Sequence, residues 1–361
     1  MLKKMMMLVW LVAGCNFGWA QSKHAAISQY PEYAGRVMCG YQGWFRAPGD
    51  GANEGWGHYL AHGKFDADHL HTDFWPDVSE YPTTYPTVLT NQDGSIARVF
   101  SSADQSTTDL HFKWMQDYGV DGVFVQRFFG GLRTAEKRKR SRLVLEHAVK
   151  SSQQYGRAIA VMYDLSGLGS HNEDCSALIQ DWKELVDDLK ITSQPTNNYL
   201  YYHGKPVVAI WGLGFPDRPY DIHQIGLEKL IDFLKNDPQY GGCAIMLGVP
   251  THFRELNNDC LPDPYLHEVM AKVDIILPWM VGRFSPREAN WSKQYEVDVQ
   301  ADLRWCQQRH LAYVPCVYPG FSWHNLSNVE THGPAKLNQI PRLQGTFYWD
   351  QIIACVQAGS K

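Results

Sequence analysis

The 361-residue sequence lacks the short motifs that mark several large classes of enzyme. It contains no Cys-x-x-Cys pair, which argues against zinc ribbons and dithiol redox sites. No Gly-x-Gly-x-x-Gly or Gly-x-x-x-x-Gly-Lys-Ser/Thr segment follows a predicted strand, so we expect no nucleotide cofactor. A Gly-x-Ser-x-Gly elbow is also missing, which disfavours a serine hydrolase.

An excess of basic residues is absent too. The chain has 33 Lys and Arg against 38 Asp and Glu, which gives a formal net charge of −5 and a pI near 6.3. Because nucleic-acid binding depends largely on neutralising phosphates, we expect no nucleic-acid partner. Aromatic side chains are abundant instead, with 13 Trp, 19 Tyr and 15 Phe. Flat rings in this number are typical of proteins that stack on sugars, although many must belong to the core.

The one long apolar run lies in the first twenty residues. Met1–Ala20 starts with Lys3 and Lys4 and continues as an apolar stretch too short to span a membrane, which predicts an export signal. Cleavage after Ala20 is one reading. Cleavage before Cys15, with lipid attached to that cysteine as in bacterial lipoproteins, is the other. Both place the protein outside the cytoplasm, in the periplasm, in the medium or anchored at the envelope, and only the second attaches it to a membrane.

The remaining seven cysteines show no pairing pattern. Cys39, Cys243 and Cys316 lie in apolar, strand-like runs, where we expect buried free thiols. Export permits a disulfide among the other four, but the sequence does not pair them. These four are Cys175, Cys260, Cys306 and Cys355.

Short apolar runs alternate with helical patterns along the rest of the chain. The predicted strands are Val37–Phe45, Gly122–Phe128, Ala158–Asp164, Pro206–Trp211, Cys243–Gly248, Val273–Trp279 and Leu311–Tyr318. The predicted helices are Thr107–Tyr118, Ala135–Tyr155, Cys175–Lys190, His223–Lys235, Pro264–Lys272 and Tyr295–Arg309. This alternation predicts a parallel sheet in an α/β fold, and seven units in a row favour a (β/α)8 TIM-type barrel over a doubly wound sheet.

We therefore expect residues 21–361 to form a single barrel domain. A barrel of this kind needs eight strands to close its ring of hydrogen bonds. The segment Gly345–Gly359 predicts a helix, and Ser360 and Lys361 follow it. The expectation from the sequence is thus a barrel that lacks its last strand in this chain.

Active sites of such barrels lie at the carboxyl ends of the strands, so the loops that follow the strands supply the candidates. They hold many aromatic and polar side chains, which suit a carbohydrate because rings stack on its C–H faces and polar groups bind its hydroxyls. The predicted substrate-binding residues are Tyr41, Gln42, Trp44, Trp56, His58, Asp73, Asp77, Gln126, Arg127, Trp211, Trp279, Arg283, Trp323, His324 and Asn325.

Several of these residues allow a second interpretation. Asp164 follows a buried strand and is a catalytic candidate, or it caps the next loop. Asp73 and Asp77 flank Trp75-Pro76 and either bind substrate or make turns. Arg127 and Arg283 either clamp a substrate or form ion pairs between loops. The run Trp323–Asn325 belongs either to the site or to loop packing.

The sequence also contains a group of histidines and a basic run. The pair His69 and His71 resembles the metal ligands of barrel hydrolases. Those ligands sit directly at strand ends, whereas Phe65–Phe74 predicts a helix, so we expect loop histidines and no metal; His58 and His62 lie nearby. The run Lys137–Arg140 opens a predicted helix and is expected to form its solvated face.

Two segments near the start of the barrel resemble a known family. Cys39–Phe45 (CGYQGWF) and Gly55–Tyr59 (GWGHY) resemble bacterial exported proteins grouped as glycoside hydrolase family 71/99-like. Asp73–Pro82, Tyr118–Phe128 and Ile340–Gln351 match the same group. The resemblance runs from Val37 to Lys361. It implies a (β/α)8 barrel and retaining hydrolysis of glycosidic bonds, as in the related endo-α-mannosidases, without specifying a substrate.

The same resemblance shows one departure. In the group, a strand after the FYWDQ helix carries two acidic residues that perform the acid–base chemistry, and here that strand is expected beyond Lys361. Within the sequence, Asp164 and Glu255 are the best catalytic carboxylates, since glycoside hydrolysis needs carboxyl groups. Two hypotheses remain: an exported glycoside hydrolase acting on a poly- or oligosaccharide, and a carbohydrate-binding barrel without catalysis.

Overall fold

The computed structural model describes residues 21–169, 173–326 and 338–360. The predicted export signal and the lipid-attachment reading of Cys15 lie outside these residues. In the part of the chain that is described, no helix is long and apolar enough to cross a membrane.

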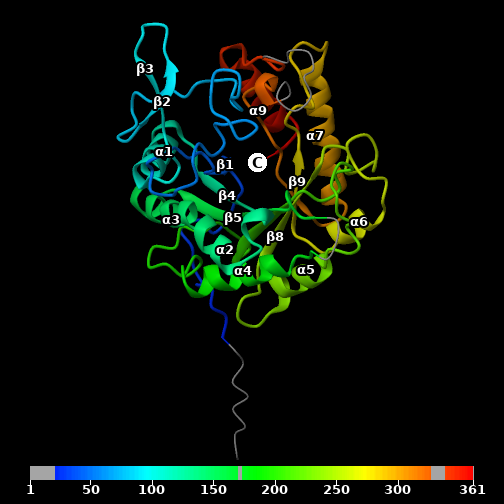
Figure 1. Ribbon diagram of the computed structural model, residues 1–361. Helices are drawn as coiled ribbons and strands as arrows, with labels where there is room; N and C mark the ends of the chain where they lie inside the picture. Colours follow the sequence, from blue (N-terminus) through cyan, green and yellow to red (C-terminus); the bar gives the residue numbers. More distant parts are fainter. Residues whose placement is uncertain (1–20, 170–172, 327–337, 361) are drawn as a thin grey trace, which may run out of the picture.

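A curved parallel sheet lies at the centre of the molecule (Figure 1). Its strands follow each other in space as they do in sequence, and every neighbouring pair is parallel. In order they are β1 (Met38–Tyr41), β4 (Gly122–Phe128), β5 (Ala158–Asp164), β7 (Lys205–Trp211), β8 (Ala244–Pro250), β9 (Ile275–Trp279) and β10 (Ala312–Tyr313). Because β1 and β10 do not pair among the described residues, the sheet is a partial barrel.

Helices follow the strands and surround the sheet on its outer side (Figure 1). They are α1 (Gln105–Tyr118), α2 (Ala135–Ser141), α3 (Leu143–Tyr155), α4 (Ser176–Asp187), α5 (Leu227–Asn236), α6 (Tyr265–Met270), α7 (Trp291–Gln307) and α9 (Thr346–Gln357). The structure also contains two short 3₁₀ turns, η1 (Phe129–Gly131) and η2 (Leu343–Gly345). This strand–helix alternation is the one that the sequence predicts.

Most predicted elements form close to their expected bounds. β4 and β5 match their predictions to the residue. The predicted strand Leu311–Tyr318 is shortened to β10, because Pro315 has no N–H to donate to a neighbouring strand. The predicted helix Ala135–Tyr155 is divided at Arg142 into α2 and α3.

The predicted helix at Phe65–Phe74 is wrong. The segment consists of turns, and a β-bridge joins Leu60 to Leu70. The Asp66 carboxylate accepts hydrogen bonds from the Asp68 N–H and the His69 ring, which is a local alternative to the helical pattern.

The long excursion between β1 and α1 has a small hydrophobic core of its own. Ala47, Tyr59 and Val99 are buried there. The hairpin of β2 (Tyr85–Thr90) and β3 (Ile96–Val99) projects from this excursion at one end of the molecule (Figure 1). The sequence pattern did not reveal this hairpin, nor the short β6 (Tyr201–Tyr202), which pairs antiparallel with β7.

All seven described cysteines are free thiols. Cys243 is buried, and Cys39 and Cys316 are half-buried. Burial raises the pKa of the Cys39 thiol to about 11, so it stays protonated at neutral pH. The disulfide that export would permit among Cys175, Cys260, Cys306 and Cys355 is not formed.

Candidate active site at the mouth of the barrel

The contacts of β4 and β5 show which side chains face the barrel interior. Arg127 on β4 and Tyr163 on β5 both donate hydrogen bonds to Asp181 on the outer helix α4, so these two side chains point outward. Successive residues of a strand point to opposite faces. Gln126, Phe128 and Asp164 therefore point inward, at the carboxyl ends where barrel enzymes place their sites.

The strand register brings an aromatic group and a carboxyl group together at the mouth. Phe128, Asp164 and Trp211 are register partners at the ends of β4, β5 and β7. Trp279 at the end of β9 lies edge-on to Trp211, with ring centroids 5.3 Å apart. The geometry thus joins three residues predicted from the sequence, Asp164, Trp211 and Trp279, at one place.

A glycine sets the position of Trp211. A Cβ atom on Gly248 of the neighbouring β8 would come within 2.3 Å of Trp211 Cδ1, so the indole ring lies directly over the glycine. The Trp211 Nε1 atom is buried and has no hydrogen-bond partner among the described residues. The guanidinium of Arg218 lies over the same ring, 5.4 Å from its centroid.

Asp164 is 4% exposed. Burial raises the pKa of its carboxyl group, while the Ser166 backbone hydrogen bond and the charge of Arg218 act in the opposite direction. The Ser166 N–H donates to Asp164 Oδ1 at 2.8 Å, so the capping role that the sequence also allowed is present. A carboxyl group that retains its proton more strongly than usual suits a general acid.

A second group of predicted residues lines a cavity of about 420 Å³ at the rim of the mouth. The cavity lies between the end of β4, the loop after β1 and helix α2. Its walls include Gln42, Trp44, His58 and Gln126. Trp44 stacks on His58, with centroids 4.1 Å apart, and on Phe128, at 5.2 Å. Desolvation against these rings, with His71 and Arg46 nearby, lowers the pKa of His58, so the imidazole is neutral at pH 7.

Asp73 joins two loops that are distant in sequence. Its carboxylate accepts hydrogen bonds from the backbone N–H groups of His324 and Asn325, at 2.8 and 2.6 Å, and from the Ser322 hydroxyl. The Asn325 side chain donates to the Thr72 carbonyl. The predicted residues Asp73, His324 and Asn325 thus meet, and their hydrogen bonds hold the two loops together. Trp323 packs beside Phe321 in the same loop.

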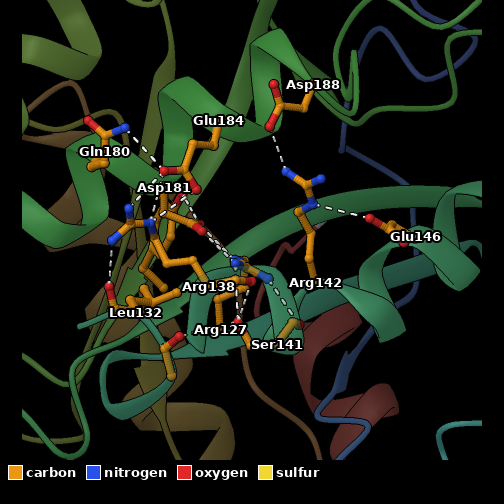
Figure 2. A network of polar contacts seen from close by, with 12 residues as sticks. Arg127, Leu132, Arg138, Ser141, Arg142, Glu146, Gln180, Asp181, Glu184 and Asp188 are labelled. Atoms are coloured by element: carbon orange, nitrogen blue, oxygen red, sulfur yellow. Dashed lines mark hydrogen bonds and ion pairs between the residues drawn. The ribbon is translucent and has the colours of Figure 1, made fainter. Parts of the chain in front are cut away.

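Arg127 is corrected from a substrate-binding residue to a residue of the fold. Its guanidinium is buried, and its Nε donates to Asp181 Oδ2 at 2.7 Å, while a second nitrogen donates to the Ser141 carbonyl. Figure 2 shows this ion pair among the polar contacts that join α2 and α3 to α4. The same network corrects part of the basic run, because Arg138 is buried and bonds to Glu184. The other members, Lys137, Lys139 and Arg140, are exposed as predicted.

Four further candidates have partners elsewhere in the fold. Tyr41 faces α1, where its hydroxyl bonds to His111 at 2.8 Å. Trp56 stacks on Phe65 in the small core of the excursion. Arg283 forms an ion pair with Asp259 at 2.7 Å, so the structure contains the ion pair between loops that was the second interpretation of this residue. Asp77 accepts from the Ser79 N–H of its own turn, and this bond lowers the pKa of its carboxyl group.

Glu255, the second catalytic candidate, lies apart from Asp164. It is exposed after β8 and forms an ion pair with the adjacent Arg254, which also bonds to Asp302 on α7. Within the described residues, no three His, Cys, Asp or Glu side chains gather in a way that would hold a metal ion. His69 of the histidine cluster bonds instead to Asp66.

Phe128, Arg218 and Gly248 were missed by the sequence analysis. The alternation of Phe124, Gln126 and Phe128 along β4 could have identified the inward face, since every second residue shares one side of a strand. Gly248 and Arg218 carry no such signal, because their roles depend on where Trp211 packs.

The chain has the fold of known glycoside-hydrolase barrels. No protein-family model matches the sequence, and no curated protein matches it. A GH99 endo-α-mannosidase from Bacteroides thetaiotaomicron, solved in complex with BIS-TRIS-propane, is similar with a TM-score of 0.53 and 13% identity over 90% of this chain and 80% of that one. Another structure of a GH99 endo-α-mannosidase from this organism is similar with a TM-score of 0.52 and 15% identity. The similarity covers 90% of this chain and 81% of that one. The described part of this protein thus forms a partial barrel whose fold is similar to that of these two structures.

Proposed function

We propose that this protein is a glycoside hydrolase that cleaves an oligo- or polysaccharide at the mouth of its barrel. The observation that carries the proposal is the position of Asp164, a buried carboxyl group at the end of β5 beside Trp211, which in turn packs edge-on against Trp279. Aromatic rings next to a carboxyl group with a raised pKa suit a sugar ring and the protonation of its leaving group.

Each of these residues has a distinct role in the proposal. Asp164 donates a proton to the glycosidic oxygen, since its raised pKa keeps it protonated at higher pH than an ordinary aspartate. Trp211 and Trp279 position the sugar by stacking. Retaining hydrolysis needs a second carboxyl group. We propose that this group belongs to the acidic pair that the family resemblance places after the FYWDQ helix.

The similar structures suggest the first substrates to test. Because both are GH99 endo-α-mannosidases, α-linked manno-oligosaccharides and α-mannan are the starting panel. The protein expressed from its natural reading frame is expected to release oligosaccharides with retained anomeric configuration, as followed by NMR. Asp164→Asn is expected to lower kcat/KM at least about 100-fold, in line with loss of a general acid.

Asp77→Asn is the matched control, because Asp77 lies in an exposed turn. It should leave kcat/KM unchanged. Glycan binding without turnover of any α- or β-glycoside would overturn the hydrolase and leave a carbohydrate-binding barrel. Equal turnover by wild type and Asp164→Asn would remove Asp164 from the mechanism.

We also propose that residues 1–20 export the protein. The basic start and the short apolar run of this segment support the proposal. N-terminal sequencing and mass determination of the mature protein distinguish a new end at Gln21 from a lipid-carrying Cys15. A mature protein that begins at Met1 would contradict export by this segment.

A further inference from the structure

We propose that the rim cavity binds an anionic substituent, a sulfate, phosphate or carboxylate group, on the glycan that enters the mouth. The inference rests on the proposed function and adds a substrate class to it. It follows from the charges on the cavity wall, from their partners and from the position of the cavity beside the strand ends.

Two cations of helix α2 face this cavity. Lys137 and Arg140 are three residues apart, so they lie on the same side of the helix, and both line the cavity. In the parts of the chain that are described, no carboxylate lies within ion-pair distance of the Lys137 ammonium group. Arg140 pairs with Glu136 one turn earlier, at 3.0 Å, with both side chains exposed. Such exposed pairs contribute little, so both cations can bind an incoming anion.

The remaining charges of the wall are matched. Arg46 Nε lies 3.2 Å from Glu54 Oε2, so the carboxylate of the wall is neutralised by a neighbouring guanidinium. Arg127 is neutralised by the buried Asp181 behind it. Lys137 and Arg140 therefore leave the cavity with an excess of positive charge, in a protein whose formal net charge is −5.

Neutral groups around the cavity suit the sugar that would carry the anion. Gln42 and Gln126 supply amides, and the buried Gln126 Oε1 has no hydrogen-bond partner among the described residues. The stacked rings of His58, Trp44 and Phe128 form the apolar side. Since Phe128 is also the register partner of Asp164, the cavity adjoins the proposed catalytic carboxyl group. One glycan could therefore contact both places.

The test compares three matched pairs of oligosaccharides by calorimetry at low and high salt. These are a sulfated oligosaccharide and its desulfated form, a phosphorylated oligomannoside and its dephosphorylated form, and a uronic-acid oligomer and its carboxyl-reduced form. We expect the wild-type protein to bind the anionic member of at least one pair about ten-fold more tightly, which identifies the anion. This preference should weaken as salt screens the charges.

Paired variants that each remove two positive charges from α2 or from α2 and α3 test the residues. Lys137→Gln/Arg140→Gln should abolish the preference while binding of the neutral partner is kept. Lys139→Gln/Lys150→Gln removes the same charge from exposed side chains that do not line the cavity, and it should keep the preference. Thermal unfolding of each variant verifies that it folds.

The outcomes separate this inference from the proposed function. Equal affinity for both members of all three pairs, or a preference that survives in Lys137→Gln/Arg140→Gln, would overturn the anion site. Hydrolysis of a neutral mannoside together with equal affinities would leave the proposed hydrolase standing. Selective binding of an anionic glycan that is never cleaved would support the anion site and contradict the hydrolase.

Discussion

His111 on α1 lies between two tyrosine hydroxyls. Its Nδ1 bonds to Tyr41 at 2.8 Å and its Nε2 to Tyr81 at 2.7 Å. Burial lowers the pKa of this histidine to about 4. A neutral ring can accept one of the hydrogen bonds and donate the other, whereas a protonated ring only donates. At the scale of single residues, this neutral histidine secures the end of β1 against α1.

The first prediction concerns the pH dependence of stability. An unfolded histidine has a pKa near 6.5, so between about pH 6.5 and pH 4 the unfolded chain takes up a proton that folded His111 does not. The contribution of His111 to the free energy of unfolding should therefore be complete above about pH 6.5. The free energy of unfolding should fall by up to roughly 3 kcal/mol as the pH drops to about 4. His111→Gln should flatten this part of the curve in urea titrations. His310→Asn, at an exposed site, should not, and an unchanged slope in His111→Gln would contradict the assignment.

The second prediction concerns the glycine beneath Trp211. Gly248→Ala places a methyl group 2.3 Å from Trp211 Cδ1, which is too close for two carbon atoms, so the indole must move. We expect the free energy of unfolding to fall by about 1–3 kcal/mol, as for other overpacked sites, and affinity for the glycan to fall with it. Gly40→Ala on β1 is the control, because its nearest contact would be 3.9 Å away. Unchanged glycan affinity of Gly248→Ala would show that the position of Trp211 does not matter for glycan binding.

Two outer helices are attached to the sheet in the same way. Asp181 on α4 accepts from Arg127 and Tyr163, and Asp302 on α7 accepts from Arg254 and from Tyr313 on β10. Each buried aspartate thus binds one arginine and one strand tyrosine. At the scale of elements, these two polar contacts fix α4 and α7 against the strands beneath them.

The third prediction tests the first of these contacts. Arg127→Met leaves Asp181 buried without its cation, and we expect the free energy of unfolding to fall by about 3–5 kcal/mol. The double variant Arg127→Met/Asp181→Leu removes both charges and should regain most of that loss. Urea unfolding of the wild type, both single variants and the double variant gives the coupling free energy between Arg127 and Asp181. Additive losses would show that the two residues do not act as a pair.

The excursion after β1 and the loop after β10 are separated by about 250 residues, yet Asp73 binds them together. This contact acts at the scale of the whole molecule, because it fixes an insertion of the first strand–helix unit to the loop of the seventh. The two loops come from opposite ends of the open sheet. Asp73 therefore limits how the rim of the partial barrel can move.

The fourth prediction tests this connection. Asp73→Ala removes three hydrogen bonds to a charged acceptor, so the amides of His324 and Asn325 should exchange faster in hydrogen–deuterium measurements. We expect a loss of about 1–3 kcal/mol in local stability. Asp77→Ala, four residues further on, removes a bond only within its own turn and should leave these amides unchanged. Exchange of both amides at the wild-type rate in Asp73→Ala would refute the role of this carboxylate.

The sequence by itself determined the fold class and much of the sheet. The apolar runs of β4 and β5 begin directly after Asp121 and Arg157, and both strands form over the residues predicted from these runs. The alternation of strands and helices predicted the parallel order of the strands. The Asp164, Trp211 and Trp279 positions followed from the rule that barrel sites lie at strand ends.

Only the tertiary structure decided what each polar side chain contacts. Arg127 and Gln126 are neighbours in sequence, yet the Arg127 guanidinium is paired with the buried Asp181, whereas the Gln126 Oε1 atom has no hydrogen-bond partner among the described residues. Lys137 and Arg138 are likewise adjacent, but the first faces the cavity and the second bonds to Glu184. Local patterns show which face a residue occupies, whereas its partner lies tens of residues away in the chain. That partner is fixed only when helices and strands pack together.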